Sequence, residues 1–113
     1  MNLLDETFEI MRTHGKQPSD VDWVGHQSGQ FAISWDEFAA MANFDYDSGY
    51  GGAEIDEDLV VVGVNWWLER HEYDGSEWWE FKTLPAKSAA SEGFRLNQNS
   101  EIDWRGDYRI RAL

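Results

Sequence analysis

Two tryptophan-rich segments, 66–73 and 76–83, flank the dipeptide Asp74-Gly75, and no other feature of the sequence limits the fold as strongly. Asp-Gly favours a two-residue type I′ turn, whose twist matches that of the strands on either side. The two segments are therefore predicted to pair as an antiparallel hairpin. Counting back from the turn places Tyr73 opposite Ser76, and this fixes the register of every other pair.

The register assigns each side chain of the hairpin to one of two faces, because successive residues of a strand point in opposite directions. On the first face we expect core packing, with the guanidinium group of Arg70 over the ring of Trp79. On the second, aromatic groups lie among charges, which is typical of a protein-binding surface if that face is exposed. The first face carries Trp66, Leu68, Arg70, Trp79 and Phe81; the second carries Trp67, Glu69, His71, Tyr73, Trp78, Glu80 and Lys82.

The same register puts Glu69 opposite Glu80, and like charges in directly opposed positions destabilise a sheet. A metal ion, a basic partner or His71 could neutralise the pair. Two other interpretations remain: both carboxylates are solvated, or a bulge shifts the register.

Two helices are predicted from apolar spacing and capping signals. Residues 3–14 have helical spacing, with Asn2 as the N-cap and Gly15 as the stop. A second helix, from Trp35 to Ala42, begins at a capping box formed by Ser34 and Glu37. It is expected to bury Phe38, Met41 and Ala42.

Short β-branched or aromatic runs predict further strands at 21–24, 31–33 and 59–62. These elements predict an α+β fold, in which a small twisted antiparallel sheet is centred on the 66–83 hairpin and two helices pack on one face. Residues 1–85 are expected to form a compact acidic domain. Residues 86–113 are interpreted as a linker and C-terminal segment, in which 108–111 could add a strand.

The chain is strongly acidic, with a formal net charge of −13 on 113 residues and no cysteine. Residues 1–83 carry 18 acidic and 4 basic side chains. Such a field attracts basic surfaces and repels nucleic acid and anionic membranes. Nucleic acid and membranes are therefore not expected as direct partners. Without cysteine, disulfides and thiolate metal sites are excluded. The first residues lack the features of a signal peptide, which favours a cytoplasmic location.

Residues 43–54 combine carboxylates and glycines with the spacing of a calcium-binding loop. The matching residues are Asn43, Asp45, Asp47, Gly49, Gly51 and Glu54. Ser48 stands where such a loop needs glycine, and a strand-like run follows instead of a helix. A turn-rich connection without a bound ion is therefore the preferred interpretation, and no cofactor is predicted.

Catalysis has little support in the sequence. His14, His26 and His71 are scattered and accompany no nucleophile motif. Pairs of carboxylates arise by chance in a chain with 22 acidic residues. We therefore predict no enzyme and no catalytic residue.

Three segments resemble small uncharacterised proteins of bacteriophages and prophages. They are Tyr46-Asp-Ser-Gly-Tyr-Gly51, Asp58-Leu-Val-Val-Val-Gly63, and the run from Trp67 to Phe81. The likeness covers residues 15–85. It implies no activity or catalytic residues, only an accessory protein made in a bacterial cytoplasm.

Together these features predict an inhibitor that binds a host nucleic-acid-binding or defence protein, such as a nuclease or a CRISPR effector, by imitating phosphate charge. Two alternatives stay open: a small-ligand or calcium-binding module using loop 43–54, and a homo-oligomeric phage accessory protein, for example a homodimer, that buries the aromatic face in a symmetric interface. The predicted contact residues are Asp45, Asp47, Glu54, Asp56, Glu57, Asp58, Trp67, Glu69, His71, Tyr73, Trp78 and Glu80.

Overall fold

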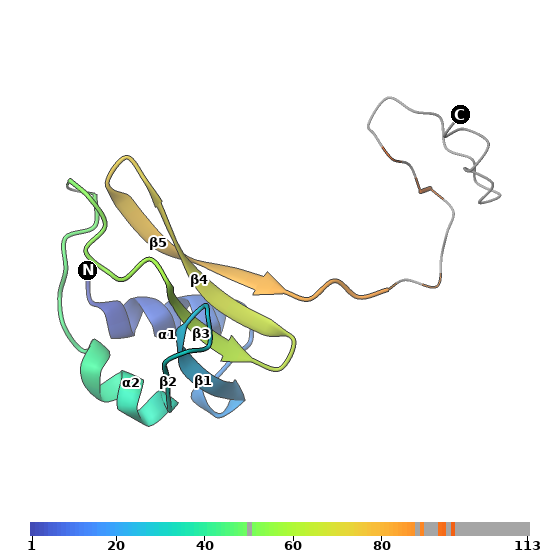
Figure 1. Ribbon diagram of the computed structural model, residues 1–113, viewed down its shortest axis with the longest axis horizontal. Helices are drawn as coiled ribbons and strands as arrows, with labels where there is room; N and C mark the ends of the chain where they lie inside the picture. Colours follow the sequence, from blue (N-terminus) through green and yellow to red (C-terminus); the bar gives the residue numbers. More distant parts are fainter. Residues whose placement is uncertain (50, 88, 90–92, 95, 97–113) are drawn as a thin grey trace.

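The computed structural model describes residues 1–49, 51–87, 89, 93, 94 and 96 (Figure 1). Two α-helices and a short 3-10 helix accompany five strands. In chain order they are α1 (Leu3–Thr13), η1 (Pro18–Asp20), β1 (Val21–His26), β2 (Ala32–Ile33), α2 (Trp35–Ala42), β3 (Leu59–Gly63), β4 (Trp66–Tyr73) and β5 (Ser76–Thr83). Neither α-helix in this described part is long and apolar enough to cross a membrane.

The strands form one antiparallel sheet in the order β2-β1-β3-β4-β5. Helix α1 packs against β5 and α2 against β1, and both helices contribute to one core with the sheet. The predicted α+β fold is confirmed. The hairpin supplies the two strands at one end of the sheet, and β3 is the middle strand. The strand expected at 108–111 lies outside the described residues.

One row of apolar side chains crosses the sheet under the helices. The register aligns one residue from each strand, in the order Ile33, Val24, Val61, Leu68 and Phe81. The three central members are fully buried. The core therefore follows from the register, which sets all five side chains on one face.

The helix starts are those that the capping signals predict. The side chain of Asn2 accepts a hydrogen bond from the backbone N–H of Asp5, and Ser34 and Glu37 form the reciprocal capping box. The predicted burial of Met41 is wrong, because its exposed fraction is 68%. In the eight-residue helix α2, Phe38 and Ala42 suffice to cover the sheet.

The hairpin has the predicted register at all eight pairs, from Trp66 opposite Thr83 to Tyr73 opposite Ser76. Asp74 and Gly75 both have positive φ angles, 52° and 86°, as a type I′ turn requires. The bulge considered for the Glu69–Glu80 pair is therefore wrong. The sheet has its irregularity elsewhere, between Val21 and Trp23 of β1.

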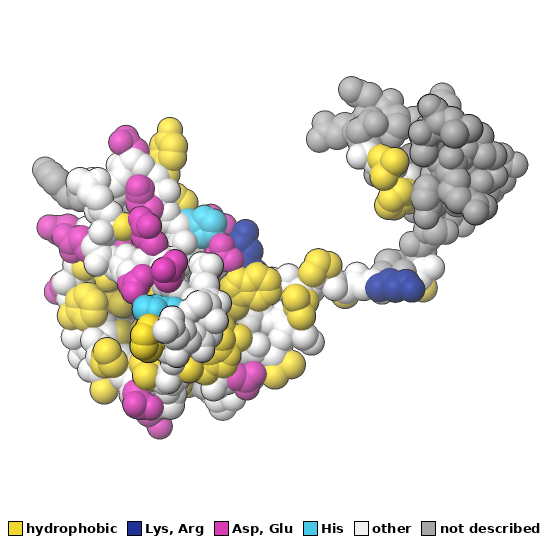
Figure 2. Space-filling view, in the orientation of Figure 1, with side chains coloured by type: hydrophobic (Ala, Val, Ile, Leu, Met, Phe, Trp, Pro, Cys, Tyr) yellow, Lys and Arg dark blue, Asp and Glu magenta, His cyan; other side chains and the backbone are white. Residues whose placement is uncertain are grey.

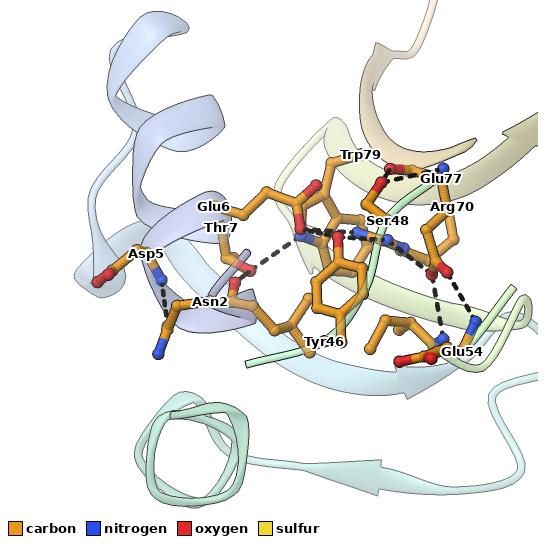
Figure 3. A network of polar contacts seen from close by, with 12 residues as sticks. Asn2, Asp5, Glu6, Thr7, Tyr46, Ser48, Glu54, Arg70, Glu77 and Trp79 are labelled. Carbon is orange, nitrogen blue, oxygen red and sulfur yellow. Dashed lines mark hydrogen bonds and ion pairs between the residues drawn. The ribbon is translucent and has the colours of Figure 1, made fainter. Parts of the chain in front are cut away.

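On the core face of the hairpin, a buried arginine is the centre of a polar network (Figure 3). Arg70 lies 4.8 Å from the centroid of the Trp79 ring, as predicted. Its guanidinium nitrogens donate to Glu77 at 3.0 Å, to Glu6 of α1 at 3.3 Å and to the Tyr46 hydroxyl at 3.1 Å. Tyr46 in turn donates to Glu6. One cation thus joins the hairpin, α1 and the 43–58 segment.

Glu77 fixes the 43–58 segment to the hairpin. Glu77 is only 4% exposed, and its carboxylate accepts hydrogen bonds from the backbone N–H groups of Glu54 and Ile55. Its own backbone N–H and C=O bond to the hydroxyl of Ser48. Gly75 lets the segment approach the turn, because a Cβ there would lie 2.8 Å from the backbone oxygen of Gly51. The long connection is therefore held in one place.

Charge and burial act in opposite directions on the pKa of Arg70. Burial lowers it, but the hydrogen bond with Tyr46, the charge of Glu6 and the hydrogen bond with Glu77 outweigh that effect and raise it. Burial, together with the hydrogen bond to Glu6, raises the pKa of Tyr46 to about 12. The network therefore keeps arginine charged and tyrosine neutral at ordinary pH.

Replacing Glu77 with alanine is expected to lower the free energy of unfolding by about 3 to 5 kcal/mol, because it removes a buried carboxylate that compensates the buried guanidinium of Arg70. Glu72→Ala is the matched control, because it removes the same charge at an exposed position directly opposite Glu77. Urea denaturation measures both variants. Equal losses for the two would contradict the structural role of Glu77.

Alkaline pH is expected to destabilise the native protein through Tyr46. A pKa raised in the folded state adds stability that is complete below the unfolded value near 10 and is lost as pH rises through about 12. Unfolding curves at pH 9, 10.5 and 12 for the native chain and Tyr46→Phe test this. The free energy of unfolding should fall less between pH 10 and 12 in Tyr46→Phe than in the native chain. An equal fall in both proteins would show that Tyr46 is not the cause.

Candidate functional site

The sheet face opposite the helices is not covered by any helix or strand of the described residues. We call it the open face. Its cross-strand rows are Trp23, Val62, Trp67 and Lys82; Val60, Glu69 and Glu80; and His71 and Trp78. Between the first two rows lies a shallow depression of about 330 Å³, which Gln27 also borders. Large aromatic groups therefore lie on both sides of the hairpin.

Each tryptophan of the hairpin on this face holds a carboxylate of its own strand. The indole N–H of Trp67 donates to Glu69 at 2.7 Å, and that of Trp78 donates to Glu80 at 3.1 Å. Residues two apart on a strand share a face, which makes this pairing possible. The result is two fixed carboxylates at the centre of an aromatic surface.

The ring of His71 and the ammonium group of Lys82 lie beside the opposed glutamates. The Nε2 atom of His71 lies 2.6 Å from Glu69 and 3.5 Å from Glu80, and Lys82 lies 3.2 Å from Glu80. The structure therefore supports His71 among the explanations considered for this pair.

The open-face carboxylates are held in their ionised form. The hydrogen bond from Trp67 lowers the pKa of Glu69, with His71 assisting, and the hydrogen bonds from Trp78 and Lys82 lower that of Glu80. A carboxylate with a lowered pKa carries its negative charge at ordinary pH, so this pair is suited to binding cations.

The predicted acidic residues are divided among three places. Asp45, Asp47 and Glu54 border a shallow hollow of about 430 Å³ beside Met1. Asp56 bonds to the ring of His26 at 2.9 Å and to the backbone N–H of Asp58.

Glu57 lines a separate cleft of about 320 Å³ together with His71, Arg70, Glu72 and Glu77. This cleft places Glu57 beside His71 of the open face. None of the other predicted acidic residues of the 43–58 segment lines it. Tyr73 lies near the hairpin turn and is 77% exposed.

Hydrogen bonds to neighbouring backbone and to the hairpin hold the 43–54 segment. The carboxylate of Glu54 accepts the backbone N–H of Asp47, and the segment turns toward Glu77. Within residues 1–49 and 51–87, no group of three or more side chains of the metal-binding types is placed to hold an ion. The segment serves as a clamped connection.

Sequence reasoning missed Glu77, Tyr46 and Glu6, which hold Arg70, and Trp23, which extends the open face. Glu77 shares the alternation of Trp79 and so had a signal for a buried position. The other three depend on contacts between distant segments, and no local pattern marks them.

The charge of the folded chain is unevenly distributed. Residues 17–69 contain 11 acidic side chains and no lysine or arginine. In the view of Figure 2, acidic side chains are spread over the domain, whereas the lysine and arginine side chains in view lie beside β5 and on the segment that follows it. The part of the chain from 17 to 69 therefore attracts cations.

Comparison with protein-family models, with curated proteins and with solved structures finds no match to this chain.

Replacing Trp67 with phenylalanine is expected to raise the pKa of Glu69 toward its ordinary value, because the indole donor is the main cause of the lowered pKa. Carbon-detected NMR titration of the carboxyl groups measures this. Trp23→Phe is the control, since the described residues offer no carboxylate partner to that indole on the same face. An unchanged Glu69 titration would refute the indole–carboxylate pairing.

Proposed function

We propose that this protein is a phage-type accessory protein that binds a basic surface of a host protein and thereby excludes nucleic acid from it. A nuclease or another defence factor with a basic groove has the required chemistry. The single observation that carries the proposal is the open face, with its fixed, ionised carboxylates between exposed parts of tryptophan rings.

Arginine is the side chain that suits this face best. A guanidinium group can stack on an indole ring and donate in parallel to a neighbouring carboxylate. The pairs Trp67–Glu69 and Trp78–Glu80 offer both elements side by side. Each carboxylate oxygen has more than one acceptor position, so the internal hydrogen bonds leave capacity for a partner.

The charge distribution adds long-range attraction to these local contacts. Proteins that bind nucleic acid present basic grooves, and a domain with this acidic field approaches such grooves rapidly. Once bound, it occupies the positions of the phosphate groups. The resemblance of residues 15–85 to phage and prophage proteins, stated above from the sequence, supports a bacterial target.

The experiment is capture from bacterial lysate on the immobilised full chain at about 0.1 M and 1 M salt, followed by nucleic-acid binding of the purified captured protein with and without this chain. We expect a basic nucleic-acid-binding protein, lost in high salt because exposed charges are screened, and competition between this chain and nucleic acid. Capture that survives 1 M salt unchanged, or the absence of competition, would refute the proposal.

A pair of double variants with the same charge change tests the open face. Glu69→Gln with Glu80→Gln removes two charges there, whereas Glu9→Gln with Asp36→Asn removes two exposed charges from the helices. The first is expected to weaken binding about tenfold or more, since one charged hydrogen bond contributes about 1.5 kcal/mol. Equal weakening by both would mean that net charge alone governs binding.

A further inference from the structure

On the helix side of the molecule, away from the open face, an apolar groove separates α2 from the 54–59 segment. It has a volume of about 240 Å³. Two exposed side chains belong to it, Met41 at 68% and Phe44 at 44%. Its other apolar lining residues are Leu3, Ile33, Phe38, Ala42, Ile55 and Leu59.

The walls of this groove are fixed in advance. Leu3, Ala42 and Ile55 belong to the buried core, with exposed fractions of 3%, 1% and 7%. The backbone N–H of Ile55 is bonded to the Glu77 carboxylate, and that of Leu3 to the carbonyl of Phe44. A preformed groove binds with little cost of ordering.

The polar groups of the groove are both acidic. Glu54 and Asp56 line it, and neither forms an ion pair with a lysine or arginine among the described residues. The nearest compensating group is the ring of His26, at 2.9 Å from Asp56. An apolar groove bordered by carboxylates that no lysine or arginine of the described residues pairs is complementary to an apolar side chain with cations beside it.

We infer that this groove is a second docking site, which takes one large aliphatic side chain of a protein partner while flanking arginine or lysine residues contact Glu54 and Asp56. Its volume is below the range of about 300 to 1,000 Å³ common for small-molecule sites and suits a single anchoring side chain. The inference is separate from the proposed function, because the groove and the open face lie on opposite sides of the sheet.

The test is NMR titration of the full chain with three short peptides: Ac-Arg-Arg-Leu-Arg-Arg-NH2, the same peptide with alanine for leucine, and Ac-Glu-Glu-Leu-Glu-Glu-NH2. We expect the first to shift the signals of Met41, Ala42 and Leu59. Alanine should weaken binding about tenfold, because a buried leucine side chain contributes most of the contact. The acidic peptide should not bind at the groove.

Matched charge variants separate the groove from general attraction. Met41→Lys puts a cation at the groove, and Val64→Lys puts one at the turn between β3 and β4, where Val64 is 69% exposed. Both positions are exposed, so both variants should fold. Only Met41→Lys should strongly weaken the Arg-Arg-Leu-Arg-Arg peptide. Equal weakening, no binding, or shifts confined to the open face would overturn the inference.

Two other occupants are distinguished in the same experiment. If the NMR signals of groove residues move when the free protein is diluted, the groove binds a second copy of this chain. Signals that move when Arg105, Arg109 and Arg111 are all changed to glutamine would assign it to the chain's own C-terminal residues. Either result would overturn the assignment to a partner. The pair Glu69→Gln with Glu80→Gln should affect the peptide no more than Glu9→Gln with Asp36→Asn, whatever the fate of the proposed function.

Discussion

A buried guanidinium group requires compensating partners, and in this fold the partners of the two terminal nitrogens of Arg70 come from three places in the chain. Arg70 meets Glu77 across the hairpin, Glu6 from α1 and Tyr46 from the long connection. Because a buried charge without compensation is costly, the position of each segment constrains the others. The network therefore explains how the 43–58 segment, whose described residues form no strand, is held against the sheet.

Local signals account for most of what the sequence predicted correctly. The Asp74-Gly75 turn sets the hairpin register, and the capping box at Ser34 starts α2, since each acts within a few residues. The predicted burial of Met41 is wrong because α2 packs on the sheet through Phe38 and Ala42, and this orientation leaves the Met41 side chain exposed. The contact of Glu6 with Arg70 joins positions 64 residues apart, and only the assembled fold reveals it.

The two tryptophan doublets explain why the sheet has two different sides. In each doublet one indole joins the core, as Trp66 and Trp79 do, and the other joins the open face. There the outer indoles bind Glu69 and Glu80 and hold them ionised. The candidate site thus arises from the same alternation that builds the core, whereas the division of the loop carboxylates among separate hollows follows from tertiary contacts.

The hydrogen bond from the Trp79 indole to Thr7 spans 72 positions of the chain. During synthesis, α1 leaves the ribosome long before β5, so the part of its buried side that packs on β5 has no partner until the hairpin has emerged. Completion of the core must therefore wait for the hairpin, and contacts of such long range slow folding. Until then, the early helix with its apolar stripe is a segment on which chaperones can act.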